Sequence, residues 1–254
     1  MRKEMAIGQG CTLPRSRELR IRHAERRDAK DFAILERACY GSIGTKVYGE
    51  SDFHAWLDTY ADFFFIAEHE GRSVGYMYSL RTDFAFPEGI SRCDTYSLSR
   101  CASLPDMHVH GGNTVLGISI ASIVRGAGRS LYDATFRKVD ILGLDYFIGH
   151  TRLSGLAAYV SGIERGLGHA LSTEQRLLAA RAYTTGCARL IGASIWSTML
   201  SQDGDRLWPA PEAPDLSLTS MLKGRAARLG VAHVTADCLH DPQSLNFGAF
   251  VVRV

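Results

Sequence analysis

The chain has 254 residues, of which 46% are hydrophobic and 22% are charged, a composition typical of a globular protein with a full core. Its formal net charge of +2 gives no global argument for binding nucleic acid or a membrane surface. No apolar run approaches the roughly 20 residues that span a bilayer, and the first residues lack the apolar core of a signal peptide. We therefore expect a cytoplasmic protein with no nucleic-acid or membrane partner.

Six cysteines, at positions 11, 39, 93, 101, 187 and 238, are scattered along the chain without a Cys-x-x-Cys pair. This spacing favours reduced thiols over a disulfide framework. His108 and His110 are spaced to chelate a metal ion, but no second pair of ligands stands near them in the sequence. We expect no metal site.

Residues 1–17 are predicted to form a flexible basic arm, which either is solvated or contacts an acidic partner such as a carrier protein. Residues 18–23 then alternate in the manner of a strand. Asp28 is a candidate N-cap for a first helix with Phe32 on its buried side, and Ser51 is a candidate N-cap for a second helix.

The clearest hairpin follows these helices. Residues 63–68 form its first predicted strand, residues 70–71 its turn and residues 73–79 its second strand. Residues 82–112 are too long a connection for a tight turn, and they are either an active-site loop or a segment without fixed structure.

The stretch from residue 114 to 142 organises the rest of the chain. Residues 114–123 are β-branched and apolar, as in a buried strand, and Gly117 in their middle predicts a bulge or kink. Residues 125–130 read Arg-Gly-Ala-Gly-Arg-Ser, and a helical pattern follows them. The apolar stripe of that helix consists of Leu131, Tyr132, Phe136, Val139 and Leu142.

A strand, a glycine turn and a helix in this order can hold a phosphate. The glycines let backbone N–H groups converge, the helix N-terminus adds a partial positive charge, and Arg125 and Arg129 add full ones. A P-loop would need Lys at position 129, and a dinucleotide fingerprint would need a third glycine at Leu131. A tight turn that binds no ligand is the alternative.

Residues 123–128 resemble the acyl-CoA signature of the GNAT superfamily of acyltransferases, Gln/Arg-x-x-Gly-x-Gly/Ala. Both glycines and Arg125 are in place, whereas Ile123 stands where the signature has Gln or Arg. The hairpin that precedes the signature strand is also similar to that superfamily. The resemblance therefore rests on two segments in the expected order.

This resemblance implies an α/β (α+β) fold, with a mixed, centrally splayed sheet flanked by helices. We expect a single domain over residues 18–254, with insertions at about 82–112 and 154–214. Residues 144–150 would form a strand parallel to residues 114–123. The two strands would separate at their C-terminal ends, and the pantetheine arm of CoA would lie between them.

Farther along, residues 154–185 are predicted to be helical and residues 186–224 irregular. Residues 226–236 and 246–252 are predicted to be two strands. This tail resembles an enlarged GNAT subgroup, whose members are fused to amidohydrolases or occur in the loading modules of polyketide synthases.

The resemblance also implies which residues hold acetyl-CoA or another acyl-CoA. They are Ile118, Ser119, Ile120, Arg125, Gly126, Ala127, Gly128, Arg129 and Ser130.

For catalysis, His150 is the first candidate for the general base, because it ends the strand predicted at residues 144–150, at the expected opening between the two strands, and imidazoles titrate near neutral pH. The alternative is a histidine that is hydrogen-bonded at a strand end. Tyr159 is the nearest tyrosine after that strand and is the candidate acid for the leaving thiolate, unless it is a core tyrosine. Thr151 matches a threonine that polyketide-type relatives use, with a His and an Arg, for decarboxylation. Their His aligns with Met221 and their Arg falls near Ala236, so we expect no decarboxylating apparatus.

The predicted function is an acyltransferase (EC 2.3.1 class) that moves an acyl group, here acetyl, from CoA to a small amine by direct attack in a ternary complex. One alternative is transfer that involves an acyl group on an acyl carrier protein. Others are a catalytically silent CoA-binding module and, less favoured, a dinucleotide-binding protein. The sequence leaves the oligomeric state open, including a homodimer.

Overall fold

The computed structural model describes residues 19–42, 47–89, 107–196, 208–223, 229–236 and 241–253. The strands are β1 (Arg20–His23), β2 (Phe64–His69), β3 (Arg72–Thr82), β4 (Thr114–Ser122), β5 (Tyr146–Arg152), β6 (Ser194–Ile195), β7 (Leu229–Thr235) and β8 (Gly248–Arg253). The helices are α1 (Ala29–Tyr40), α2 (Glu50–Tyr60), α4 (Ala127–Ile141), α5 (Leu156–Leu167), α6 (Thr173–Ile191) and α7 (Leu216–Leu222).

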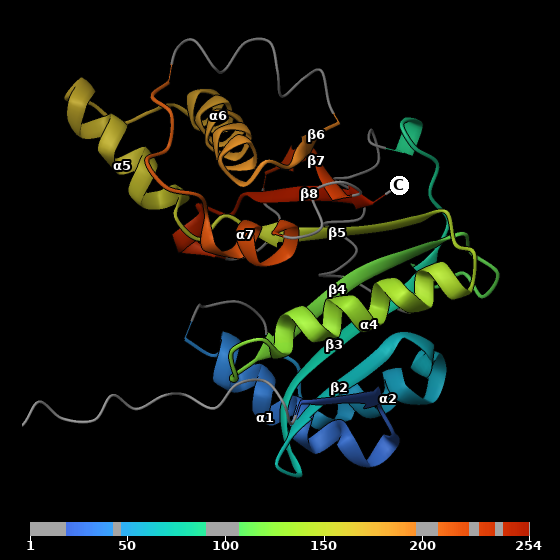
Figure 1. Ribbon diagram of the computed structural model, residues 1–254. Coiled ribbons are helices and arrows are strands. Elements are labelled where there is room, and N and C mark those ends of the chain that lie inside the picture. Colours follow the sequence, from blue (N-terminus) through green and yellow to red (C-terminus); the bar gives the residue numbers. More distant parts are fainter. Residues whose placement is uncertain are drawn as a thin grey trace, which may run out of the picture.

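The strands form one mixed sheet of eight, in the order β1-β2-β3-β4-β5-β8-β7-β6 (Figure 1). Only the β4–β5 and β6–β7 pairs are parallel among the described strands. The α/β fold with a mixed sheet and flanking helices, which the resemblance implied, is therefore confirmed.

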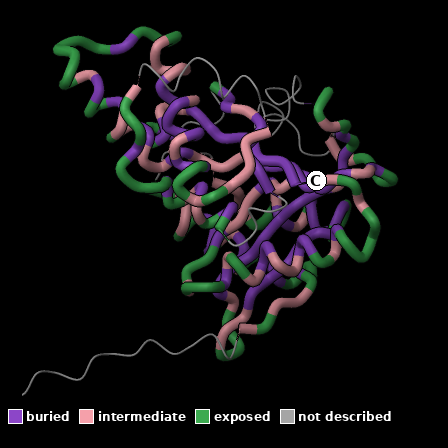
Figure 2. The backbone as a smooth tube through the Cα atoms, turned by 45° about the horizontal axis from the view of Figure 1, so that its top comes forward, coloured by how far each residue is buried: buried purple, intermediate pink, exposed green. Residues whose placement is uncertain are grey.

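Two hydrophobic clusters cover the two faces of this sheet, because successive side chains of a strand point to opposite faces. On β2, Phe64 and Ile66 pack with α1 and α2, whereas Phe65 and Ala67 pack with the cluster that contains α4, α5, α6 and α7. We call these two sides the α1 face and the α4 face. Figure 2 shows the buried backbone running along the sheet between them.

The predicted hairpin is present as β2 and β3. Its turn residues Glu70 and Gly71 both have positive φ, at 51° and 72°, a backbone conformation that suits the twist of a two-residue hairpin loop. The predicted disturbance at Gly117 is also present. Gly117 faces Ser79 and the β3–β4 register then shifts, so that Ile118 is the extra residue of a bulge.

Strands β4 and β5 form the splayed centre of the sheet. They pair in parallel from Thr114–Tyr146 to Gly117–Gly149, and no farther. Beyond that point β4 continues beside β3, while β5 continues beside β8. Figure 1 shows the two strands diverging, with α7 near their open end. The parallel, separating strands expected at 114–123 and 144–150 are confirmed, with β5 both beginning and ending two residues later than expected.

The irregular structure predicted for residues 186–224 is wrong where α6, β6 and α7 lie. Helix α6 continues to Ile191 because its buried side still packs on the core, and the short strand β6 follows. Helix α7 is added later in the segment. It forms because the Asp215 carboxylate accepts hydrogen bonds from the N–H groups of Ser217 and Leu218, at 2.9 and 3.0 Å.

Three smaller expectations change as well. Leu142 is not on the buried stripe of α4, because it is the C-cap residue and 46% exposed. Ser51 lies within the first turn of α2, whose N-cap is Gly49, and Asp52 accepts the Gly49 N–H at 2.8 Å. Asp28 holds the N-cap position of α1, but its side chain makes no capping hydrogen bond to that helix.

The predicted arm at residues 1–17 and most of the 82–112 connection lie outside the described residues. Cys39 and Cys187 are free thiols, and the other four cysteines are outside the described ranges. In the part of the chain that the structure describes, no helix has the length and apolar character needed to cross a membrane.

Candidate active site

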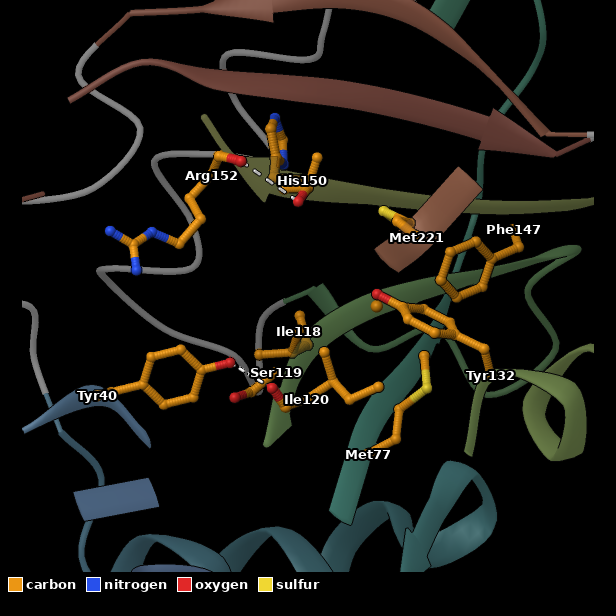
Figure 3. Close-up of a pocket in the computed structure, with 12 residues that line it drawn as sticks. Tyr40, Met77, Ile118, Ser119, Ile120, Tyr132, Phe147, His150, Arg152 and Met221 are labelled. Carbon is orange, nitrogen blue, oxygen red and sulfur yellow. Dashed lines mark hydrogen bonds between the residues drawn. The ribbon is translucent and has the colours of Figure 1, made fainter. Parts of the chain in front are cut away.

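A cleft occupies the space where β4 and β5 separate (Figure 3). Its β4 wall consists of Gly117, Ile118, Ser119 and Ile120, and its β5 wall contains residues 147 and 150–152. Side chains from α1, β3, α4 and α7 complete the lining. Five of the residues predicted for the site, namely Ile118, Ser119, Ile120, His150 and Thr151, therefore line one cleft.

Glycine at position 117 lets the two walls approach. A Cβ atom there would lie 2.8 Å from Cζ of Phe147, a side chain with no solvent exposure. Any side chain at this position would push Phe147 into the packed core or part the strands. The bulge at the next residue then turns β4 away from β5. The sequence thus specifies where the cleft begins.

The two candidate residues of β5 lie on opposite faces of the sheet. His150 pairs with Phe250 of β8, and their ring centroids are 4.8 Å apart. Because Phe250 belongs to the cluster on the α1 face, His150 also lies on that face. Thr151, the next residue, faces the α4 side, and its hydroxyl is 3.4 Å from the Arg152 carbonyl oxygen.

Arg152 is fixed at the mouth of the cleft. Its Nε and Nη2 donate to the Asp241 carboxylate at 2.8 and 3.0 Å, and Nη2 also donates to Gln243 at 2.8 Å. The Asp241 side chain is almost completely buried. This two-point contact holds the guanidinium in one orientation. The positive charge is thus balanced by a partner in the turn before β8.

A second hollow lies at the start of α4, where the sequence predicts a phosphate loop. Gly126 is the N-cap of α4 with φ of 93°, a left-handed conformation that favours glycine. Gly128 also lines the hollow, with the side chains of Arg125 and Arg129. Lys223, the residue after the unexpected helix α7, adds a third cation. Positive charge, glycine backbone and a helix N-terminus meet here.

Two predicted residues of this loop take other positions. Ala127 is fully buried, and its N–H donates to the Val124 carbonyl at 3.1 Å. The N–H of Ser130 donates to the Gly126 carbonyl at 3.0 Å, as a helical hydrogen bond. Of residues 126–130, Gly126, Gly128 and Arg129 therefore line the hollow, whereas Ala127 and Ser130 do not.

The structure does not bring Tyr159 to the cleft. Helix α5 carries it away from the end of β5, and its hydroxyl donates to the Pro209 carbonyl at 2.7 Å. The tyrosines that do line the cleft are Tyr40 from α1 and Tyr132 from α4. The Tyr40 hydroxyl donates to the carbonyl of Ile120 (Figure 3).

A buried polar group behind the β4 wall was missed by the sequence analysis. Glu36 of α1 is 2% exposed, and its carboxylate accepts hydrogen bonds from the hydroxyls of Tyr76 and Ser119. Burial and the Glu36 charge hold the pKa of Tyr76 well above its ordinary value, so Tyr76 stays protonated and donates. One signal was available in the sequence: Glu36 follows Phe32 by four residues, which places it on the buried side of α1.

No group of three or more His, Cys, Asp or Glu side chains within the described ranges is arranged to hold a metal ion.

No family model and no curated protein sequence matches the chain. Solved structures do match it. The GphF GNAT-like decarboxylase in complex with isobutyryl-CoA aligns with a TM-score of 0.64 at 18% identity, over 92% of this chain and 98% of that chain. The loading GNATL domain of CurA from Lyngbya majuscula aligns with a TM-score of 0.59 at 15% identity, over 92% and 96%.

These two alignments extend over nearly the whole of all three chains. The chain therefore has the GNAT-like fold, and its overall architecture is similar to that of the GphF decarboxylase and the CurA loading domain. At these identities the likeness concerns the fold. What the chain binds and does has to be argued from its own residues.

Proposed function

We propose that this protein is an acyltransferase that takes an acyl group from an acyl-CoA and transfers it to a small amine. The observation that carries the proposal is the cleft between β4 and β5, together with the cationic hollow at the N-terminus of α4. A narrow cleft suits the pantetheine arm of CoA, and the hollow suits its pyrophosphate. The GphF structure contains isobutyryl-CoA, which supports the same class of ligand.

In this proposal the pyrophosphate lies against Gly126 and Gly128, with Arg125 and Lys223 on either side of it. The thioester lies near Gly117, where backbone N–H groups at the bulge stabilise the developing oxyanion. Apolar side chains nearby, such as Met77 and Phe147, leave room for a small acyl group such as acetyl.

The transfer is direct. In the ternary complex the amine attacks the thioester carbon itself, and no side chain is acylated on the way. The attacking amine must lose a proton, and His150 is the residue that the sequence predicts for this step. The leaving thiolate needs a proton as well. Tyr132 reaches into the cleft from α4 and takes this role in place of Tyr159 (Figure 3).

Decarboxylation is the second candidate, because GphF is a decarboxylase and Thr151 lines the cleft. The position that corresponds to the histidine of polyketide-type relatives is Met221, which also lines the cleft. A thioether cannot exchange a proton. Ala236, near the position of the relatives' arginine, is exposed and is not part of the lining. These two departures favour simple acyl transfer.

Thermal unfolding with a panel of ligands tests the ligand class. Acetyl-CoA and isobutyryl-CoA are expected to raise the melting temperature, because a ligand that binds only the native state stabilises it. NAD and ATP serve as controls with similar phosphates but no pantetheine. An equal shift with NAD would contradict the proposal and favour a dinucleotide-binding protein.

Release of the CoA thiol, followed with a thiol reagent and by mass spectrometry, tests the reaction. We expect release from acetyl-CoA to depend on an added small amine. Loss of carbon dioxide from malonyl-CoA without an amine would support decarboxylation instead. Release that requires an acyl carrier protein would support transfer that involves a carrier protein. Binding of acyl-CoA without release of CoA or carbon dioxide would support a catalytically silent module.

A further inference from the structure

Glu36 is a buried carboxylate one hydrogen bond away from the cleft. Its Oε2 accepts from the hydroxyl of Tyr76 and, at 3.3 Å, from that of Ser119, and the two hydroxyl oxygens are 3.1 Å apart. Burying a carboxylate costs free energy that such hydrogen bonds only partly offset. Of the three residues, Ser119 lines the cleft. The group therefore connects the interior of the α1 face with the proposed site of reaction.

The bulge in β4 creates this connection. Side chains of a regular strand alternate between faces, but Ile118 packs in the cluster on the α1 face and Ser119 contacts Glu36 on the same face. Without the bulge at Ile118, Ser119 would face α4 instead. Tyr40, one turn after Glu36 on α1, lines the same wall of the cleft. Helix α1 thus supplies a polar wall for an acceptor.

We propose that Glu36 takes up the proton that the attacking amine loses, with Ser119 as the residue that touches the amine. This inference rests on the acyl transfer proposed above. As the amine nitrogen bonds to the thioester carbon, its N–H proton passes to Ser119 Oγ, and the Ser119 hydroxyl proton passes to the Glu36 carboxylate. Strand β4 itself carries no Asp or Glu, so the carboxylate comes from α1.

Tyr76 is a positioning residue in this arrangement. Its raised pKa, caused by burial and then by the Glu36 charge, keeps its proton in place, so that it orients the carboxylate without accepting a proton. The other titratable groups that face this site within the described residues are Cys39 and Tyr40 on α1. Burial and the Glu36 charge raise the pKa of the Cys39 thiol, so it stays neutral near pH 7.

The test compares Glu36→Gln and Ser119→Ala with the wild type in amine-dependent release of CoA. Both variants are expected to lose about 10²-fold in kcat near pH 7, a typical contribution of general base catalysis. The ascending limb of their pH profile moves to alkaline pH, where the amine is already deprotonated in solution. The KM for acetyl-CoA and its thermal shift stay close to those of the wild type.

Asp31→Asn is the matched control. Asp31 is also on α1 and its carboxylate accepts from a β3 hydroxyl, that of Ser73, but neither residue lines the cleft. This variant is expected to keep the kcat and the pH profile of the wild type. If Glu36→Gln does not fold, Ser119→Ala gives the same test.

His150→Gln distinguishes between two routes for the amine proton. One is the relay from Ser119 to Glu36, and the other is direct uptake by His150, the base that the sequence predicts. The relay predicts that adding Ser119→Ala to His150→Gln still moves the ascending limb to alkaline pH, relative to His150→Gln alone. If His150→Gln is active only at alkaline pH while Ser119→Ala keeps the wild-type profile, the base is His150 and the relay is wrong. A wild-type protein that releases no CoA with any amine would contradict the proposed function instead.

Discussion

Arg125, Arg129 and Lys223 are the cations that line the hollow at the start of α4. Replacing Arg125 or Lys223 by Ala is expected to weaken acetyl-CoA binding about fivefold, because an exposed ion pair contributes up to about 1 kcal/mol. Titration calorimetry at low and high salt measures this, and the difference between wild type and variant should shrink as salt screens the phosphates.

Arg137→Ala is the control for this pair. Arg137 is an exposed cation on the same helix, and its Nε donates to the carbonyl of Asp133 in the helix itself. If Arg137→Ala weakens binding as much as the other two substitutions, the effect is one of net charge and the hollow is not the phosphate site.

Gly117 is expected to be intolerant of even a methyl group. In Gly117→Ala the new Cβ would lie 2.8 Å from Cζ of the buried Phe147, and overpacking of this kind costs about 1–3 kcal/mol of stability. Urea unfolding measures the loss. Gly111→Ala should be nearly neutral, since a Cβ at Gly111 meets nothing within 4 Å. Equal stabilities of the two variants would contradict the tight approach of β4 and β5.

Residues whose role depends on local backbone could be predicted from the sequence, and residues whose role depends on distant packing could not. Gly117 and Gly126 can be recognised in the sequence, because glycine within a strand indicates a bulge or a close approach, and glycine before a helix indicates a tight turn. Glu36 meets Ser119 across 83 positions of sequence. Tyr159 is close to β5 in the sequence, but helix α5 carries it away from the cleft.

Among the elements, the start of α7 is held by the side chain of Asp215. The Asp215 carboxylate accepts from the N–H groups of Ser217 and Leu218 at the start of α7, from the N–H of Gly155 at 2.8 Å, and from the Tyr183 hydroxyl at 3.1 Å. Asp215→Ala leaves these donors buried without an acceptor. We expect a loss of more than about 2 kcal/mol in unfolding free energy.

Acyl-CoA binding is expected to weaken in the same variant, because α7 carries Met221 to the cleft and leads to Lys223 at the hollow. Asp215→Asn keeps one acceptor oxygen, so it should lose less stability and less affinity for acyl-CoA than Asp215→Ala. Denaturant unfolding and calorimetry measure the two effects. An Asp215→Ala protein that unfolds like the wild type would show that α7 does not depend on this cap.

The difference between local sequence signals and distant contacts also explains why the sequence predicts the hairpin but not α7. The turn at Glu70-Gly71 and the alternation of β2 and β3 are local signals. Residues 216–222 form a short helix after a proline-rich stretch, and its cap is shared with Gly155 and Tyr183 from other elements. Tertiary contacts therefore decide that this segment is a helix.

For the molecule as a whole, stability should fall in mild acid. Burial, followed by the charges of His110 and Arg81, holds the pKa of His108 below its ordinary value in the folded state. Between the unfolded pKa of about 6.5 and the lower folded value, the unfolded chain binds more protons, so stability is lost as the pH falls. Urea unfolding between pH 8 and pH 5 measures this.

His108→Gln is expected to make that dependence shallower. If the slope of unfolding free energy against pH is the same in this variant and in the wild type, other groups cause the acid sensitivity. The test concerns stability alone, since His108 does not line the cleft.

The arrangement of the sheet is the part of the fold that local patterns leave undetermined. The order β5-β8-β7-β6 inserts the last strand of the chain next to β5. That placement lets β5 leave β4 without becoming an edge strand, because Gly149 to Arg152 pair with β8. The splayed pair was expected only through the GNAT resemblance. The strand pairings that keep it open come from the whole chain.

A crystal structure of the protein with acetyl-CoA tests the central claim most directly. We predict the pyrophosphate against Gly126 and Gly128, and the thioester between β4 and β5 beside Gly117. A CoA molecule bound elsewhere on the surface, with the space between the ends of β4 and β5 filled by side chains, would contradict the account.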